Sequence, residues 1–356
     1  MTRTWLKWTP AVAVPAVIAV GVLAVPLQAG AAVDLPEKTP QAVLELAAGS
    51  TVDTFSGTLE QSSALGLPEI PSTGDAQAGE FADALELLTG DHTVRVYQNG
   101  ADQSRVQVQD TMSERNLIRN GADLWLYDSA DNTATHTTLP ADAEPAAPEK
   151  SYTPGELAET FLAEVTPSTI VSLGENTEVA GRGAYELVLT PNTDDTLVAS
   201  VAIAVDAETG LPLRVQVEAQ DATEPAISVG FTSLSLQAPA ADLIAFTPPD
   251  GATVTEETLP ATDGPTGKDG SHPEAADSGV TVIGTGWDAV VVMPAGADAE
   301  ALAELTASPL YSQLTDAVDG GRALSSTLVS VLITDDGRVF AGAVPVERLQ
   351  AAAAQE

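Results

Sequence analysis

The chain has 356 residues and contains no cysteine. The absence of cysteine excludes disulfide bonds, thiolate metal ligands and a thiol nucleophile. It also excludes a lipoprotein whose lipid is attached to a cysteine after an apolar signal. A chain of this length can bury enough apolar surface to fold without covalent cross-links.

Basic residues are scarce. The sequence has 14 lysines and arginines against 51 aspartates and glutamates, which gives a formal net charge of −37. Such an excess of negative charge opposes binding to nucleic acid or to anionic lipid surfaces through general electrostatics. We therefore predict no nucleic-acid partner. The simplest interpretation of the charge is an acidic, well-solvated surface that keeps the protein soluble.

Residues suited to catalysis or metal binding are also few. The three histidines, His92, His136 and His272, lie in separate segments without the spacing of metal ligands. There is no G-x-S-x-G motif, no P-loop and no G-x-G-x-x-G fingerprint that opens a helix. Val282–Gly286 is interpreted as a strand bend, and Asp335–Gly337 lacks the spaced ligands of a calcium loop. We predict that the protein is not an enzyme and has no catalytic residue, metal site or cofactor.

The N-terminal segment has the three parts of a secretory signal. Arg3 and Lys7 precede an apolar run from Pro10 to Leu27, and small residues follow at positions 29–32. This layout predicts a signal peptide over residues 1–32. A retained membrane anchor is the alternative, because the run is about long enough to span a bilayer. Either way the protein is extracytoplasmic: secreted, or anchored at the outer face of the cytoplasmic membrane.

Residues 33–257 combine helical and strand patterns. Period-two runs joined by Asn99-Gly100 and Asn120-Gly121 predict an antiparallel meander, since Asn-Gly is a strong hairpin signal. Helices are expected at 39–48, at 80–89 and after Thr153. A sheet as wide as the one these runs predict must curve or close. We predict an α+β fold, in which helices cover the concave face of a curved antiparallel sheet, or unclosed β-barrel.

The C-terminal part of the chain has a different composition. Residues 258–279 are rich in proline, glycine, aspartate and serine, and predict a flexible linker. Residues 280–356 predict a small α+β module. It has a strand pattern to Met293, a helical pattern over 298–318, a hairpin around Asp335–Gly337 and a closing helix from Val346.

The alternating strands place apolar side chains on one face of the predicted sheet, because residues two apart along a strand share a face. The candidates for the lining of a hydrophobic cavity are Phe55, Leu59, Val94, Val96, Val106, Val108, Leu124, Leu126, Val201, Ile203, Val215 and Val217. A dry packed core is the alternative for each of them. Trp125 and Tyr127 point away from Leu124 and Leu126, and alternation alone leaves open which pair faces the cavity.

The loop from Ala64 to Gly79 is rich in proline, glycine and serine, yet it carries Leu65, Leu67 and Ile70. Apolar residues in such a loop either form a lid over a groove or pack locally. A cavity that takes an acyl chain gains about 0.8 kcal/mol per buried methylene and needs no charged site. Binding of an acyl chain is therefore consistent with a sequence that has no cluster of candidate catalytic or metal-binding residues.

Several short motifs follow one another in a characteristic order. They are Phe55–Glu60, Leu65–Pro71, Arg105–Gln109, Asp123–Asp128, Ala184–Pro191, Asp206–Val215 and Phe246–Gly251. This set resembles the LolA/RseB-like superfamily (MucB/RseB and lipoprotein carrier LolA-like proteins), especially its actinobacterial branch. The resemblance implies an unclosed β-barrel whose cavity binds acyl chains of lipids or lipoproteins. It also implies an alternative, an RseB-like regulatory module that acts on an anti-sigma factor or another membrane partner.

Overall fold

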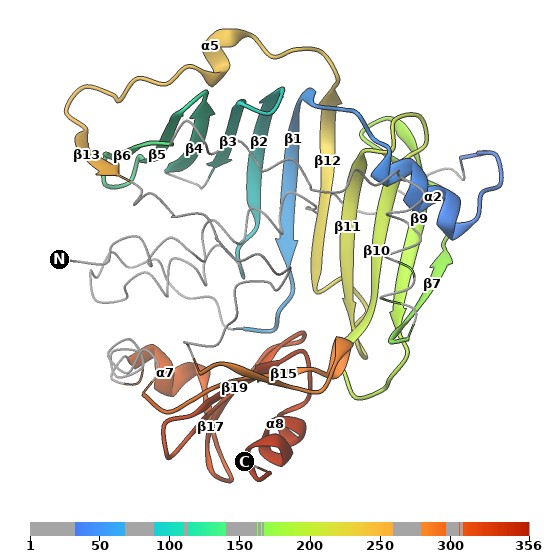
Figure 1. Ribbon diagram of the computed structural model, residues 1–356, viewed down its shortest axis with the longest axis vertical. Coiled ribbons are helices and arrows are strands. Elements are labelled where there is room, and N and C mark those ends of the chain that lie inside the picture. The colour runs from blue at the N-terminus through green and yellow to red at the C-terminus, as the bar shows by residue number, and fades with distance from the viewer. Residues whose placement is uncertain are drawn as a thin grey trace, which may run out of the picture.

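The computed structural model describes residues 33–67, 89–109, 113–139, 162, 165, 167–258, 279–296, 306 and 309–355. These residues form a large and a small β-sheet with short helices beside them (Figure 1). No helix within this part of the chain is long and apolar enough to cross a membrane. The predicted signal segment 1–32 and residues 259–278 of the predicted linker lie outside it.

The large sheet has 13 strands in the order β13-β6-β5-β4-β3-β2-β1-β12-β11-β10-β9-β7, with β8 paired to β9. The strands are β1 (Thr54–Ser63), β2 (His92–Asn99), β3 (Gln103–Gln109), β4 (Glu114–Asn120), β5 (Asp123–Asp128), β6 (Thr133–Thr138), β7 (Thr169–Leu173), β8 (Thr177–Val179), β9 (Arg182–Pro191), β10 (Val198–Asp206), β11 (Pro212–Ala219), β12 (Ile227–Ser235) and β13 (Thr253–Thr258). The predicted meander and its two Asn-Gly turns are confirmed, and Gly100 and Gly121 have positive φ angles of 70° and 65°.

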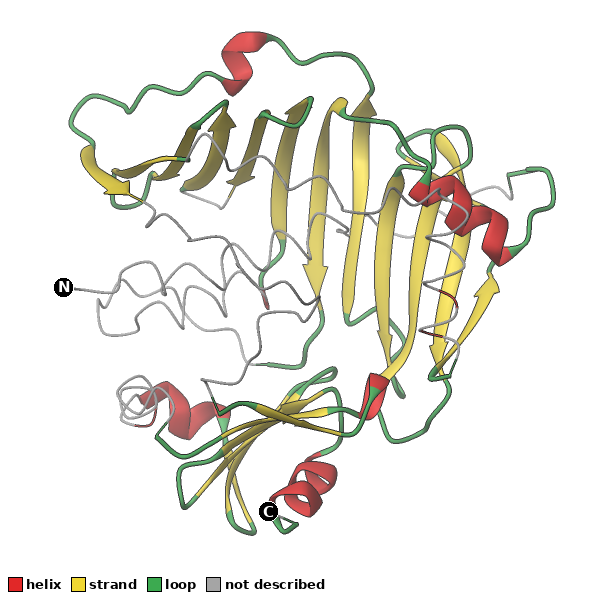
Figure 2. Ribbon diagram, viewed as in Figure 1, coloured by secondary structure: helices red, strands yellow, loops and turns green. Residues whose placement is uncertain are grey.

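The large sheet is curved and stays open, because its edge strands β13 and β7 do not pair with each other (Figure 2). The predicted unclosed sheet is therefore confirmed, with one correction. Strand β13 runs parallel to β6, so the sheet is mixed and not purely antiparallel. Sequence patterns missed β13 because Val254 is its only apolar residue, and two glutamates follow in the same strand.

Helix α2 (Pro40–Ala48) packs on one face of the large sheet. It begins as predicted, with the Thr39 hydroxyl accepting a hydrogen bond from Ala42 N at 3.2 Å. Its Val43 is fully buried in a cluster with Tyr185, Leu187, Leu189 and Val205. The helices predicted at 80–89 and after Thr153 lie largely outside the described residues.

The small sheet has six strands in the order β14-β15-β19-β18-β17-β16. They are β14 (Thr281–Ile283), β15 (Val290–Met293), β16 (Asp316–Val318), β17 (Gly321–Ser325), β18 (Ser330–Thr334) and β19 (Val339–Gly342). A short 3-10 turn, η2 (Gly286–Asp288), joins β14 to β15, and helix α7 (Pro309–Leu314) precedes β16. The closing helix α8 (Val346–Ala353) is confirmed and packs on Val290, Leu332 and Phe340.

The helical pattern predicted over 298–318 is wrong at its C-terminal end. Residues Asp316–Val318 form β16, which pairs with β17 around the turn at Asp319-Gly320. Gly320 has a φ angle of 86°, which glycine adopts without the strain of a side chain. The Asp-Gly pair is a hairpin signal, and the helical interpretation overlooked it.

The C-terminal module packs against one end of the large sheet. Its Leu328 is 5% exposed and joins a cluster with Val198, Ala219 and Ala226 of the large sheet and its turns. Trp287 Nε1 donates to Thr169 Oγ1 at 2.8 Å, and Leu197 N donates to Ala343 O at 2.8 Å. Shared apolar packing and direct hydrogen bonds thus join the two sheets.

Candidate ligand-binding face

Strand register places the predicted lining residues on one face of the large sheet. Val106 of β3 pairs with Val96 of β2 and with Leu117 of β4, and Leu117 pairs with Leu126 of β5. Directly paired residues lie on the same side of a sheet, so these four side chains form a row across four strands. By the same register this side also carries Phe55, Leu59, Val94, Val108 and Leu124.

The same face continues over the second half of the large sheet. Val201 and Ile203 of β10 pair with Val217 and Val215 of β11. Strand β12 connects the halves, since its Phe231 pairs with Leu59 and its Val229 pairs with Val215. We call the whole set, from Leu124 and Leu126 to Val201 and Ile203, the apolar face.

Three members of the apolar face were not among the predicted residues: Leu117, Val229 and Phe231. Leu117 was missed because β4 carries Ile118 on its other side, so alternation did not select a face. Pairing across the two Asn-Gly hairpins would have found it, because those turns fix the register of Val106, Leu117 and Leu126.

Burial divides the apolar face into two parts. Val201, Ile203, Val215, Val217, Phe55 and Leu59 pack against buried clusters, in part beneath α2. These six residues therefore lie in a packed core. A second group is half-buried and joins no buried cluster of the described residues: Val94, Val96, Val106, Val108, Leu117, Leu124 and Leu126. We call these seven residues the β2–β5 patch.

The segment around a short helix packs on the opposite face of strands β2–β5. The rings of Trp125 and Tyr127 lie 5.4 and 5.5 Å from the ring of Phe246, which follows the short helix α5 (Ala241–Ile244). Arg105 Nη1 donates to Leu243 O at 3.2 Å. The segment around α5 therefore packs on the side that carries Trp125 and Tyr127. Leu124 and Leu126 lie on the other side, with the β2–β5 patch, and their role in lining a cavity stays a prediction.

The residues predicted to form a lid lie at the end of β1. The Leu65 carbonyl accepts a hydrogen bond from Thr327 N at 2.9 Å, and Leu65 packs in the cluster between the large sheet and the module. Leu67 is half-buried, and Ile70 lies outside the described residues. Leu65 thus has a structural contact with the module, and the lid role of all three residues stays a prediction.

His136 joins three strands on the face that carries Trp125. Its Nδ1 lies 2.8 Å from Glu256 Oε2 of β13, and its Nε2 lies 2.9 Å from Asp123 Oδ1 of β5. Burial lowers the pKa of His136, but the hydrogen bonds with the two carboxylates outweigh burial and hold the pKa above 6.5. The Trp125 ring stacks on the imidazole at 4.2 Å. His136 is therefore a strand residue whose two ring nitrogens both contact carboxylates.

The carboxylates of Asp123 and Glu256 contact opposite ring nitrogens of His136, so the three groups do not converge on one metal position. Within the described ranges, no group of three or more histidines and carboxylates could hold a metal ion.

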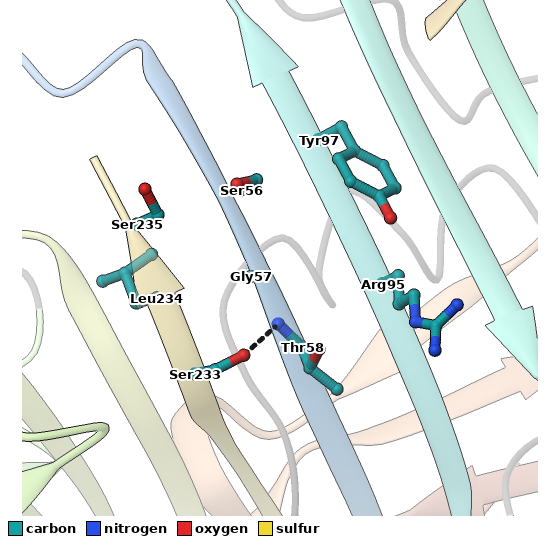
Figure 3. Close-up of a pocket in the computed structure, with 8 residues that line it drawn as sticks. All are labelled: Ser56, Gly57, Thr58, Arg95, Tyr97, Ser233, Leu234 and Ser235. Carbon is teal, nitrogen blue, oxygen red and sulfur yellow. Dashed lines mark hydrogen bonds between the residues drawn. The ribbon is translucent and has the colours of Figure 1, made fainter. Parts of the chain in front are cut away.

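A shallow pocket of about 270 Å³ lies where β12, β1 and β2 run side by side (Figure 3). Hydroxyl groups dominate its lining, so we call it the hydroxyl pocket. Its residues are Ser56, Gly57, Thr58, Arg95, Tyr97, Ser233, Leu234 and Ser235. The Ser233 hydroxyl accepts a hydrogen bond from Thr58 N at 3.3 Å, beside a break in register between Thr58 and Leu59. None of the predicted site residues lines it.

No protein-family model matches the chain, and no curated protein sequence matches it either. Among solved structures, the chain matches one from the MucA/MucB complex of Pseudomonas aeruginosa. The identity is 15% and the TM-score 0.44, over 88% of this chain and 96% of that one. The chain is thus similar to a structure of the MucB/RseB kind. A LolA superfamily protein from Nitrosomonas europaea matches at 14% identity and a TM-score of 0.23, over 59% of this chain and 99% of that one.

Identities and TM-scores this low carry no argument about function, so no function is transferred from these structures. The fold predicted from the sequence is confirmed. The assignment to an actinobacterial branch stays a prediction.

Proposed function

We propose that the protein is an extracytoplasmic carrier or sensor that binds acyl chains of lipids or lipoproteins on its apolar face. The observation that carries the proposal is the β2–β5 patch, in which seven aliphatic side chains on four neighbouring strands stay half-buried. A row of aliphatic side chains that stays partly accessible and joins no buried cluster of the described residues suits an apolar ligand.

The chemistry of the patch suits an alkyl chain. The side chains that define the patch are valines and leucines, and the same face also carries Arg115, paired with Val108, and Arg119, paired with Leu124. An acyl chain gains about 0.8 kcal/mol for each methylene removed from water, so ten methylenes contribute about 8 kcal/mol before the loss of freedom on binding. The negative charge of the protein does not oppose this contribution, which is non-directional and independent of charge.

Substitution in the middle of the patch tests the proposal. Val106→Asp places a carboxylate between Val96 and Leu117, and we expect fatty-acid affinity to fall at least about tenfold, because burying an unpaired charge is costly. The matched control is Gln103→Asp, which adds the same charge to the other side of β3. Fluorescent fatty-acid titration and native mass spectrometry measure binding, and thermal melting verifies folding. Equal affinity in the Val106→Asp variant and the wild type would overturn the proposal.

An RseB-like regulatory role is the alternative, in which the module contacts an anti-sigma factor or another membrane protein. A feature of the small sheet favours it. Val282 on the edge strand β14 is 61% exposed, and its partner Val291 on β15 is 39% exposed. Capture from envelope extracts with the full chain tests this role. It is supported if a membrane protein is retained by the wild type and lost with Val282→Lys, and it fails if no such protein is retained.

A further inference from the structure

We propose that the hydroxyl pocket binds a phosphate group, with Arg95 as its principal donor. This site lies on the face of β2 opposite Val94 and Val96, since Arg95 alternates with them along the strand. It therefore does not depend on acyl-chain binding to the β2–β5 patch.

Arg95 is unusual among the arginines of this acidic chain. The other arginines that the structure describes each have a hydrogen-bond or ion-pair partner. Arg95 alone in this part of the chain has none, although the sequence supplies 51 carboxylates. Glu60, which lies on the same face of the neighbouring strand β1, makes no ion pair with it. The guanidinium is thus free to bind an external anion.

The surroundings of Arg95 supply further donors and no negative charge. Tyr97 follows two residues later on the same face, and Ser56 and Thr58 lie on β1 beside the two side chains. Figure 3 shows Arg95 and Tyr97 together on β2, with the hydroxyls of β1 and β12 alongside. The hydroxyls of Tyr97, Ser56 and Thr58 have no hydrogen-bond partner among the described residues. No carboxylate lines the pocket.

The arrangement of these donors favours a tetrahedral anion. A guanidinium satisfies two oxygens through its fork, and hydroxyls from β1 and β12 are placed to reach others. A phosphate group has further oxygens beyond the two that the guanidinium contacts, whereas a carboxylate must use the same two oxygens for every donor. The pocket volume of about 270 Å³ leaves room for one small substituent on the anion. The ligand class is therefore a phosphate group, free or carried on a lipid headgroup.

The net charge of −37 lowers the affinity that we expect for an anion. The remaining carboxylates repel any anion that approaches, whereas contacts at hydrogen-bond distance act locally. At an ionic strength of about 0.15 M the Debye length is about 8 Å, so the distant repulsion is largely screened while the direct contacts persist. We expect a dissociation constant on the order of 1 mM for inorganic phosphate under these conditions.

The test uses the full chain with three probes: inorganic phosphate, glycerol phosphate, and vesicles of phosphatidylcholine with phosphatidylglycerol. Phosphorus NMR line broadening measures binding of the two soluble probes, and co-sedimentation measures vesicle binding. In Arg95→Gln the affinity should fall about tenfold or more, and in Tyr97→Phe about threefold, as charged and neutral hydrogen bonds are lost. Arg119→Gln is the matched control, because Arg119 pairs with exposed Asp102 outside the pocket.

Binding of the soluble probes that depends on Arg95 supports a site for a free phosphate group. Arg95-dependent binding of vesicles alone supports the same site with a lipid headgroup as the source. The proposal is overturned if none of the three probes binds the wild type. It is also overturned if Arg95→Gln binds as tightly as Arg119→Gln.

Discussion

His136 connects β5, β6 and β13 through its two ring nitrogens, and β13 is the edge strand that precedes residues 259–278. A neutral imidazole donates only one hydrogen bond, whereas the protonated ring donates to both carboxylates. The contacts with Asp123 and Glu256 are therefore strongest when His136 carries a charge. A single side chain thus makes the attachment of an edge strand depend on pH.

The sign of this pH dependence follows from the raised pKa. The folded-state pKa of His136 lies above 6.5, so its contribution is fully present below pH 6.5 and is lost as pH rises through the folded pKa. As the pH rises from about 6.5 through the folded-state pKa, the melting temperature of the wild type should decline relative to that of His136→Gln. The comparison cancels the titration of the other acidic groups. Parallel curves for the two proteins would contradict this account.

Asp206, at the turn between β10 and β11, is a second residue whose side chain makes several hydrogen bonds. Its carboxylate accepts hydrogen bonds from Arg182, from Thr209 N at 2.7 Å and from Glu208 N at 3.0 Å. Burial raises the pKa of Asp206, but the bonds from Arg182 and Thr209 outweigh burial and hold the pKa below 3.8. The side chain is 1% exposed and stays ionised, which fixes the hairpin turn.

Removal of the Asp206 carboxylate should destabilise the protein substantially. We expect Asp206→Ala to lose about 2–4 kcal/mol, because Arg182 and two backbone amides lose their acceptor. Glu208→Ala is the control: Glu208 contacts the same arginine but is 82% exposed, and its loss should stay below about 1 kcal/mol. Urea unfolding measures both. Equal losses in the two variants would show that burial of Asp206 is not what matters.

At the scale of elements, sequence patterns identify strands that alternate and turns that carry glycine. The meander β2–β6 follows from its two Asn-Gly turns, and α2 follows from Thr39-Pro40. Local patterns do not identify strands that pair with a strand far away in the sequence. β13 has little alternation and is held by β6, more than 100 residues earlier, as the His136–Glu256 separation of 120 shows. Local pattern cannot supply such a pairing.

The candidate sites, too, could be predicted from local sequence patterns only in part. Membership of the apolar face was predictable, because period two assigns Val94, Val96, Val106 and Val108 to one side. Which part of that face is covered was not, because α2 packs on β9 and not on its neighbours in sequence. The hydroxyl pocket was out of reach, since Thr58 and Ser233 are 175 residues apart and meet only when β1 pairs with β12.

At the scale of the whole molecule, the contact between the two sheets makes their stabilities interdependent. Leu328 of the module is buried against residues of the large sheet, and Trp287 and Ala343 reinforce the contact. Leu65, at the end of β1, belongs to the same cluster. The module therefore packs against the end of β1, which lies between β2 and β12.

Truncation of Leu328 tests this coupling. We expect Leu328→Ala to cost about 2–4 kcal/mol and to split a single thermal transition into two, because the cluster between the sheets loses its central side chain. Val329→Ala is the matched control, since Val329 is 42% exposed and should change stability by less than about 1 kcal/mol. Differential scanning calorimetry distinguishes one transition from two. A single unshifted transition in Leu328→Ala would argue against interdependent sheets.

We propose above all that an acyl chain binds to the β2–β5 patch of an open, curved sheet. Photo-crosslinking with a diazirine fatty acid, followed by mass-spectrometric mapping of the labelled residues, tests this placement most directly. We predict labels concentrated in residues 92–109 and 114–128, and their loss in Val106→Asp but not in Gln103→Asp. Labels confined to other segments, or unaffected by Val106→Asp, would contradict the account.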